Sequence, residues 1–175
     1  DGTAMLAHLG MSGQFRVSTQ HAPQHRHTRI VITLDDGRDL RFLDQRTFGG
    51  LTLAPLVDGI PGPVTHIAPD PFEECFDVDE VVRRLCARRS AIKRSLLDQT
   101  LVSGIGNIYA DETLWRVRCH PETPCSRLSQ SEAVELLQTA CDVMAEAMSQ
   151  GGTSFDSLYV NVNGESGWFS RVLDA

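Results

Sequence analysis

Two glycines separated by one residue, Gly104 and Gly106, interrupt an apolar stretch and are followed at once by Asn107. Glycine allows backbone conformations that other residues avoid, and it lets the backbone approach a ligand closely. Asn is a residue type that caps the start of a helix, and the free amide groups of a helix start bind phosphate. The segment therefore predicts an anion site with Asn107 as the N-cap of a helix.

The helix predicted after Asn107 carries a carboxylate that could take part in chemistry. Glu112 lies just over one helical turn beyond Asn107. It is either a buried carboxylate that faces a reaction centre or an acid of the first turns that complements the helix dipole. The spacing fits both interpretations.

Basic residues gather immediately before the glycine-containing turn. The six are Arg83, Arg84, Arg88, Arg89, Lys93 and Arg94. A solvated helix face is the simpler interpretation of such a cluster. The net charge of the whole chain, −7, also argues against a general affinity for nucleic acid.

Length and composition limit the classes of protein that the chain can belong to. Its 175 residues are 41% hydrophobic, which is enough for one ordinary core or two small ones. The sequence has no stretch of eighteen apolar residues, so we expect a soluble, cytoplasmic protein that does not enter a membrane. Its five cysteines form no CxxC pair, which predicts reduced thiols and no metal site within this chain.

The first part of the chain has the pattern of β-strands. Strands are expected at 4–9, 14–17, 28–34 and 39–43, and Asp36-Gly37 indicates a hairpin between the last two. Prolines are concentrated between 54 and 71, which predicts a surface connection.

The second part has the pattern of helices. Asp77, Ser90 and Ser129 are the expected helix starts, and a helical pattern from Ile92 to Val102 precedes the glycines. The helix after Ser129 is expected to end at Gly151-Gly152. Its predicted apolar stripe consists of Val134, Leu137, Cys141, Met144 and Met148. Strands followed by helices indicate an α+β fold with two domains.

Four segments, read together, resemble the bacterial formamidopyrimidine-DNA glycosylases, which share a fold with endonuclease VIII. They are HLGMSG at 8–13, DQRTFGG at 44–50, LLDQTLVSGIGNIYADE at 96–112, and the segment from Gly151 to Phe169. The resemblance implies part of a β-sandwich domain at 1–66, including the proline-rich connection, and a helical domain with a helix-two-turn-helix motif at 67–175. It also implies that the partner is double-stranded DNA with a damaged base, bound by a monomer.

The resemblance assigns a phosphate contact to Asn107, supported by the amides around Gly104 and Gly106 and by Lys93 and His8. It assigns Met11 and Phe48 to an apolar wedge that fills the space of an extruded base. Arg46 would hydrogen-bond the partner base beside that wedge. Without the resemblance, a Met and a Phe next to strands would be read as core residues.

The segment from 155 to 169 is expected to include a lesion-recognition loop. Tyr159, Glu165 and Ser166 are candidates for lining the base pocket, and a plain surface connection is the alternative. Glu112 would support catalysis.

In the resembled family the nucleophile is the amine of an N-terminal proline, and a zinc finger closes the C-terminal end. Neither the proline nor the zinc-binding cysteines occur in this sequence. The resemblance therefore implies the interior of a longer protein, which would be inactive alone and would hold no cofactor, the zinc ion being expected in a finger beyond it.

The implied activity is base-excision repair by a bifunctional DNA glycosylase and apurinic or apyrimidinic lyase. It would remove 8-oxoguanine and formamidopyrimidines and nick the strand by β,δ-elimination. Two alternatives are a non-catalytic helix-two-turn-helix protein that binds nucleic acid and an endonuclease VIII-like glycosylase for oxidised pyrimidines. The DQRTFG segment favours the purine-specific branch.

Overall fold

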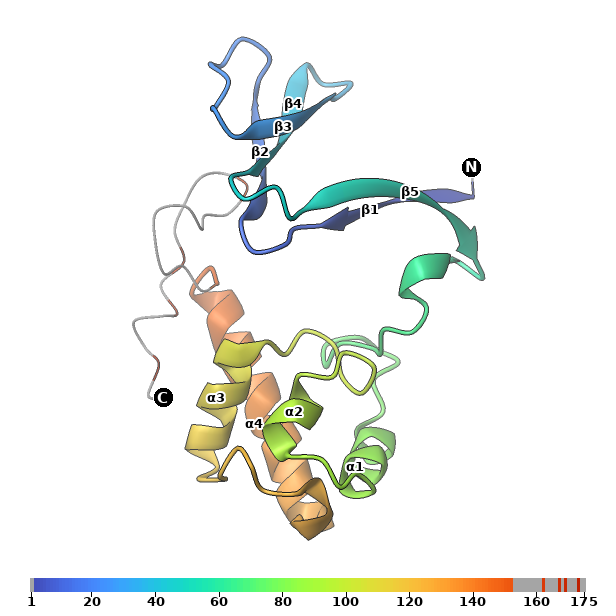
Figure 1. Cartoon of the computed structure of the whole chain (residues 1–175), viewed down its shortest axis with the longest axis vertical. Coiled ribbons are helices and arrows are strands. Elements are labelled where there is room, and N and C mark those ends of the chain that lie inside the picture. Colours follow the sequence, from blue (N-terminus) through green and yellow to red (C-terminus); the bar gives the residue numbers. More distant parts are fainter. Residues whose placement is uncertain (1, 153–161, 163–166, 168, 170–172, 174–175) are drawn as a thin grey trace. The chain divides into compact units, whose positions relative to one another are not determined.

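The computed structural model describes residues 2–152, 162, 167, 169 and 173. The chain forms two compact units, one of residues 1–63 and 150–171 and the other of residues 64–149 and 172–175. The described elements of the first, here called the sheet unit, are strands with one short 3-10 turn, and those of the second, the helical unit, are helices (Figure 1). The α+β class predicted from the sequence is confirmed.

The sheet unit contains two antiparallel sheets of three strands each. The first has the order β1-β5-β6 and the second the order β2-β4-β3. The strands are β1 (Thr3–His8), β2 (Gly13–Thr19), β3 (Thr28–Thr33), β4 (Arg38–Asp44), β5 (Gly50–Val57) and β6 (Ile60–Pro61). The predicted hairpin joins β3 to β4, and Gly37 supplies the positive φ of 79° that its turn requires.

The buried ring of Phe42 fixes the base of two turns in this unit. Its centre lies 5.3 Å from that of the Phe15 ring, its register partner in β2, and the two rings are tilted by 49°. A Cβ atom on Gly13 or Gly49 would lie 2.9 or 2.7 Å from the tip of the Phe42 ring. The two glycines therefore leave space for Phe42, and the turns before them, at Met11 and Phe48, are held close to it.

The proline-rich segment is more regular than expected. β5 extends to Val57, and β6 and a 3-10 turn at Gly62–Val64 follow. Pro55 is paired with Thr3, and Pro61 with Leu56. The prediction of a plain connection from residue 54 was wrong, because a proline can lie in a short strand that has few ladder hydrogen bonds to lose.

The helical unit contains four α-helices whose starts were only partly predicted. They are α1 (Val78–Cys86), α2 (Ile92–Leu96), α3 (Asn107–Arg116) and α4 (Gln130–Ser149). Asp77 caps α1 by accepting the Glu80 amide, and Ser129 and Glu132 bond reciprocally at the start of α4, so both predicted caps are confirmed. The predicted cap at Ser90 was wrong, because its hydroxyl pairs with Ser95 and α2 begins after Ala91.

α4 packs against both α1 and α3 and supplies much of the core of this unit (Figure 1). Its buried face differs from the predicted stripe, since Val134 and Met148 are exposed. The small side chains Ala133, Ala140 and Ala147 let the neighbouring helices approach closely on that face. The buried residues of α4 are Ala133, Leu136, Leu137, Ala140, Val143, Met144 and Ala147. Positive φ values at Gly151 and Gly152 follow its end, as predicted.

None of the helices in the described part of the chain has the length and apolar character needed to cross a membrane. All five cysteines are free thiols, of which Cys125 is buried.

Candidate functional site

α2 and α3 are joined by an irregular loop of residues 97–106. The helical pattern expected to continue to Val102 breaks at Leu96, where α2 ends. The apolar side chains of Leu101, Val102 and Ile105 nevertheless point into the core, because all three are at most 1% exposed. These buried side chains therefore anchor the loop to the core. The anchored loop fixes the position at which α3 begins.

Gly104 adopts a left-handed conformation in this loop, with φ of 87°. A Cβ atom there would lie 2.8 Å from the terminal methyl of Met144 in α4. The Gly104 amide donates to Oε1 of Gln99 at 2.9 Å. A side chain of the same loop therefore accepts the Gly104 amide, and the contribution of Gly104 to a phosphate site stays a prediction.

The first residue of α3 is Asn107, and its N-cap is Gly106 with extended backbone angles. The N-cap predicted at Asn107 is one residue too late, because Asn107 is already the first residue of α3 and Gly106 is the N-cap. The first amide accepted within the turn is that of Ala110, which donates to the Gly106 carbonyl at 2.9 Å. Within the described residues, the amides of Gly106, Asn107 and Ile108 have no acceptor.

The Asn107 side chain is exposed and has no hydrogen-bond partner among the described residues. It lies beside the free amides of its own helix start, where the positive end of the helix dipole favours an anion. Donors from one side chain and two or three amides can together hold a phosphate group. At the predicted anion site, the Asn107 side chain and the Gly106 amide have no acceptor among the described residues, whereas the Gly104 amide is bonded to Gln99.

Lys93 of α2 is ion-paired across to α3. Its Nζ lies 2.7 Å from Oδ1 and 2.9 Å from Oδ2 of Asp111, and both side chains are partly exposed. Lys93 is therefore close to α3, although a phosphate would have to compete with Asp111 for it. His8 lies at the exposed end of β1 in the sheet unit, and its role stays a prediction.

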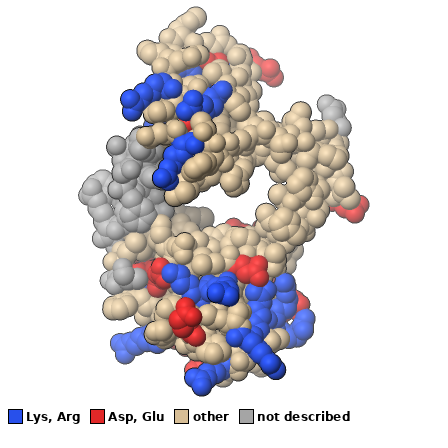
Figure 2. Space-filling view, in the orientation of Figure 1, with Lys and Arg blue, Asp and Glu red and all other residues tan. Residues whose placement is uncertain are grey.

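Most of the basic cluster is engaged within the helical unit. Arg83 pairs with Glu80, Arg88 with Asp98, and Arg84 donates to the Thr100 carbonyl. Figure 2 shows Lys and Arg side chains over this unit with Asp and Glu among them. Of the six, only Arg89 and Arg94 have no partner among the residues that the structure describes.

Glu112 is completely buried and pairs with Arg116, one turn later in α3, at 2.7 Å. Arg116 also contacts Glu146 of α4 at 2.9 Å. Glu112 is the sixth residue of α3, beyond the first turn, so the interpretation as a first-turn acid was wrong. Its carboxylate ties α3 to α4, and a role beside a reaction centre stays a prediction.

In the sheet unit, Met11, Arg46 and Phe48 lie together at two adjoining turns. Met11 and Phe48 are 60% and 63% exposed, so the reading of both as core residues was wrong. The Arg46 Nη1 donates to the Met11 sulfur at 3.4 Å, and its guanidinium carbon lies 5.9 Å from the centre of the Phe48 ring. Three side chains from two separate segments thus form one exposed group, here called the wedge.

The turns of the wedge are packed directly on each other. Gly10 has a positive φ of 59°, and a Cβ atom there would lie 2.9 Å from the Phe48 carbonyl carbon. Thr47, between Arg46 and Phe48, also has a positive φ, 57°, which is rare for a β-branched residue. Such strain persists only where surrounding contacts impose it, and it is common at functional sites.

Asp44 supplies those contacts, and sequence reasoning did not single it out. Its carboxylate is buried and accepts the Ser12 hydroxyl at 2.6 Å, the Gly49 amide at 2.8 Å and the Arg46 amide at 3.2 Å. These hydrogen bonds, led by that of Ser12, hold the pKa of Asp44 below its ordinary value against the opposing effect of burial. One carboxylate therefore joins both turns of the wedge.

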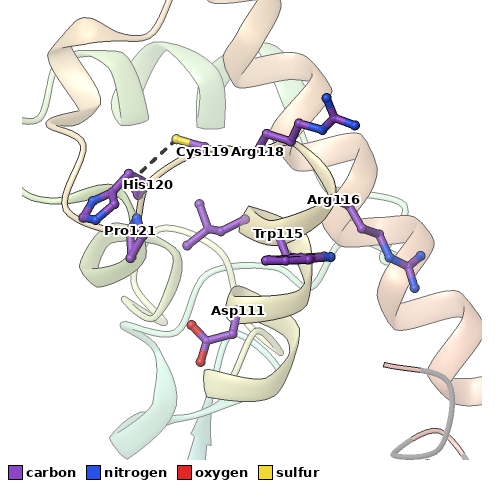
Figure 3. Close-up of a pocket in the computed structure, with 8 residues that line it drawn as sticks. Asp111, Trp115, Arg116, Arg118, Cys119, His120 and Pro121 are labelled. Carbon is purple, nitrogen blue, oxygen red and sulfur yellow. Dashed lines mark hydrogen bonds between the residues drawn. The ribbon is translucent and has the colours of Figure 1, made fainter. Parts of the chain in front are cut away.

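Trp115 is 61% exposed, although it continued the apolar pattern of α3 in the sequence. It lines a surface pocket of ≈840 Å³ in the helical unit. In Figure 3 the indole lies between Asp111 and the turn of Cys119, while Arg116 and Arg118 extend away from it. The geometry assigns no ligand to this pocket. Its lining residues are Asp111, Leu114, Trp115, Arg116, Arg118, Cys119, His120 and Pro121.

The candidate pocket residues Tyr159, Glu165 and Ser166 lie outside the described residues. The described part contains no group of three or more His, Cys, Asp and Glu side chains that could hold a metal ion.

Two family models match the chain. The formamidopyrimidine-DNA glycosylase H2TH domain matches residues 67–158, and the N-terminal domain of the same enzymes matches residues 1–51. The formamidopyrimidine-DNA glycosylase of Nocardioides sp. is 54% identical over 178 residues, which cover 100% of this chain and 60% of the relative. That of Mycolicibacterium vanbaalenii is 57% identical over 176 residues, covering 98% and 59%.

Solved structures are also similar to this chain. A complex between the Lactococcus lactis Fpg and an abasic site containing DNA has a TM-score of 0.82 and 30% identity, covering 99% of this chain and 63% of that one. A complex of a mutant of that enzyme with a Fapy-dG containing DNA has a TM-score of 0.83 at the same identity and coverage. The chain spans about three fifths of the length of these relatives. Since the H2TH model alone covers more than half of the chain, the protein belongs to the formamidopyrimidine-DNA glycosylase family.

Proposed function

We propose that the protein is a base-excision repair glycosylase that binds double-stranded DNA at a damaged base and acts as a monomer at the bacterial nucleoid. The observation that carries this proposal is the wedge. Two apolar side chains that are about 60% exposed, one of them next to the strained Thr47, serve no purpose in a folded core. A protein that extrudes a base from a duplex needs such a group to fill the space left behind.

The start of α3 holds a phosphate of the damaged strand. Asn107 and the free amides of Gly106 and Ile108 are the donors, and Lys93 and His8 support the contact. Hydrogen bonds to phosphate fix the register of the protein on the duplex and carry no sequence information. This is the behaviour that a repair enzyme needs, because damage occurs in every sequence.

Met11 and Phe48 enter the stack in place of the extruded nucleotide, and Arg46 hydrogen-bonds the orphaned partner base. Apolar side chains inserted between base steps offset part of the lost stacking. The contacts of Arg46 with the Met11 sulfur and the Phe48 ring support this role, because they hold all three side chains in one orientation before DNA arrives.

The substrates are oxidised purines, including 8-oxoguanine and formamidopyrimidines, and the strand is nicked by β,δ-elimination. The pocket for the base includes Tyr159, Glu165 and Ser166, and Glu112 supports the site through α3. A Schiff base with the sugar needs an amine nucleophile. In the resembled family this amine belongs to a proline that does not occur in this sequence, and the only lysine, Lys93, is paired with Asp111. We therefore expect these 175 residues to bind damaged DNA without cleaving it.

The wedge is tested by the preference for damaged DNA. Binding of a duplex with a central abasic-site analogue and of the intact duplex is measured by fluorescence anisotropy at low salt. Phe48→Ala lowers the ratio of the two affinities about tenfold, which corresponds to roughly 1.4 kcal/mol of lost wedge contact. The matched control is Leu53→Ala, which removes an apolar side chain of β5 that is even more exposed than Phe48, 73% against 63%.

A wild-type protein with equal affinity for both duplexes would contradict the proposed function and favour a plain nucleic-acid-binding protein. A second assay uses borohydride reduction with 8-oxoguanine DNA. No covalent complex is expected for these 175 residues, and a trapped complex would overturn the statement that they lack the nucleophile.

A further inference from the structure

The loop before α3 is held by a side chain that has no place in the glycosylase mechanism. We propose that Gln99 is a positioning residue that presets the phosphate site at the start of α3. This inference rests on the proposed function, because it concerns the same Asn107 site. It assigns Gln99 no contact with DNA.

Gln99 uses both ends of its side-chain amide inside the loop. Its Oε1 accepts the Gly104 amide at 2.9 Å, and its Nε2 donates to the carbonyls of Leu97 at 3.2 Å and Ile105 at 3.0 Å. Both donors of the side-chain amide are therefore satisfied. These three bonds span the loop from the end of α2 to the residue before the N-cap of α3.

The backbone of Gln99 extends the same network to the preceding segment. Its carbonyl accepts the Ala68 amide at 2.9 Å, and nearby the Pro69 carbonyl accepts the Ser103 amide at 3.3 Å. The chain that enters the helical unit is thereby fastened to the loop. The loop is thus held both by the Gln99 side chain within it and by backbone hydrogen bonds to the preceding segment, and a substitution at Gln99 removes only the side-chain bonds.

The loop is also in contact with α4. Met144 fills the space where a side chain at Gly104 would lie, so Gly104 is held between Met144 and Gln99. Only Ile105 and Gly106 separate Gly104 from Asn107. The direction of the Asn107 side chain and of the free amides is thus set by how Gln99 fixes Gly104 and Ile105.

A purely stabilising role would have a different signature from a positioning role. Loss of stability alone lowers the unfolding temperature and leaves the effects of Gln99 and Asn107 on binding independent. Positioning makes the two effects dependent, because Gln99 acts on DNA only through the Asn107 site. A double-mutant cycle measures this dependence directly.

The experiment compares wild type, Gln99→Met, Asn107→Ala and the double variant in binding to a duplex with an abasic-site analogue. Met keeps the length of the side chain and removes its three hydrogen bonds. We expect each single variant to bind about tenfold more weakly and the double variant to bind within about twofold of the weaker single one. Gln138→Met is the matched control, since Gln138 is exposed on α4 and bonds only Asp142, and it binds as wild type.

Independent effects, with the two losses multiplying in the double variant, overturn the positioning role, as does wild-type binding by a folded Gln99→Met protein. If Asn107→Ala binds as wild type, the proposed phosphate site itself fails, which is a distinct outcome. Hydrogen exchange of the wild-type protein gives a second test that needs no variant. The Gly104 amide is expected to exchange at least tenfold more slowly than an unstructured amide, and exchange at the unstructured rate overturns the proposal.

Discussion

Gly104 meets two requirements that a larger residue cannot meet at once. Its φ of 87° lies in the left-handed region, and a Cβ atom would lie 2.8 Å from the Met144 methyl. Asn107 makes the contrasting case, because it is exposed, without a described partner and in ordinary helical angles. At this turn one residue is determined by the fold and another is available for function.

Gly104→Ala is expected to lower the free energy of unfolding by about 1–3 kcal/mol, because the strained backbone and the contact with Met144 both oppose the added methyl. Urea unfolding measures the loss. Gly106→Ala is the steric control, since no atom lies within 4 Å of its added Cβ and its φ is negative. Equal losses in the two variants would show that Met144 and the left-handed backbone do not matter.

The depressed pKa of Asp98 predicts that the free energy of unfolding depends on pH. Hydrogen bonds from Thr100 and Arg88 lower its pKa to about 2. A carboxyl with a depressed pKa stabilises the fold above its unfolded pKa of about 3.9, and the contribution is lost as pH falls from about 4 to 2. Since the side chain is 34% exposed, we expect only about 1 kcal/mol from it.

The measurement compares Asp98→Asn with wild type by urea unfolding at pH 6 and at pH 3. The variant is expected to be less stable at pH 6, and the difference should shrink at pH 3. A difference that stays constant between the two pH values would mean that the Asp98 charge does not contribute.

At the scale of elements, the wedge depends on two turns that a single carboxylate joins. Ser12 both donates to Asp44 and accepts the Arg46 amide at 3.0 Å, so it links the Met11 turn to the Phe48 turn. This link spans more than thirty residues of sequence. No local pattern in the chain could have indicated it.

Ser12→Ala is expected to raise the pKa of Asp44 toward its ordinary value and to lower the preference for abasic-site DNA severalfold, because the turns are then less well fixed. Carbon-detected NMR titration follows the carboxyl, and the anisotropy assay follows the preference. Ser126→Ala, at an exposed position of the helical unit, serves as the control. An unchanged Asp44 pKa would contradict the assigned hydrogen bond, and an unchanged preference would contradict its importance for the wedge.

Local signals predicted several elements well. The caps at Asp77 and Ser129 and the Asp36-Gly37 hairpin depend on neighbours within three or four residues, and all three were correct. The buried face of α4 differs from the predicted stripe because packing against α1 and α3 determines which side chains are covered. The sequence of α4 alone does not contain that information. Gln99 and Asp44 were missed for the same reason, since their roles come from contacts that tertiary structure creates.

At the scale of the whole molecule, the protein is an acidic chain of net charge −7 that nonetheless belongs to a DNA glycosylase family. Three of the six residues in its basic cluster are paired with carboxylates, those of Glu80, Asp98 and Asp111. The DNA binding proposed for this protein would therefore depend on a few well-placed donors. The exposed group at Met11 and Phe48 could be assigned to function from sequence only through the family resemblance.

This charge distribution predicts a small salt dependence. A plot of the logarithm of the binding constant against that of salt concentration is expected to have a slope of about −2 to −4, since few cations are free to displace counterions. Lys93→Gln should reduce the magnitude of the slope by about 1 if Lys93 leaves Asp111 for a phosphate. An unchanged slope would mean that Lys93 remains with Asp111 in the complex.

The most direct test of the account replaces single phosphates of an abasic-site duplex, one at a time, with neutral methylphosphonates. One position near the abasic site is expected to weaken wild-type binding about tenfold and to leave the affinity of Asn107→Ala unchanged, because that variant has already lost the contact. If Asn107→Ala loses as much affinity as wild type at every position, the start of α3 does not hold a DNA phosphate and the central claim is wrong.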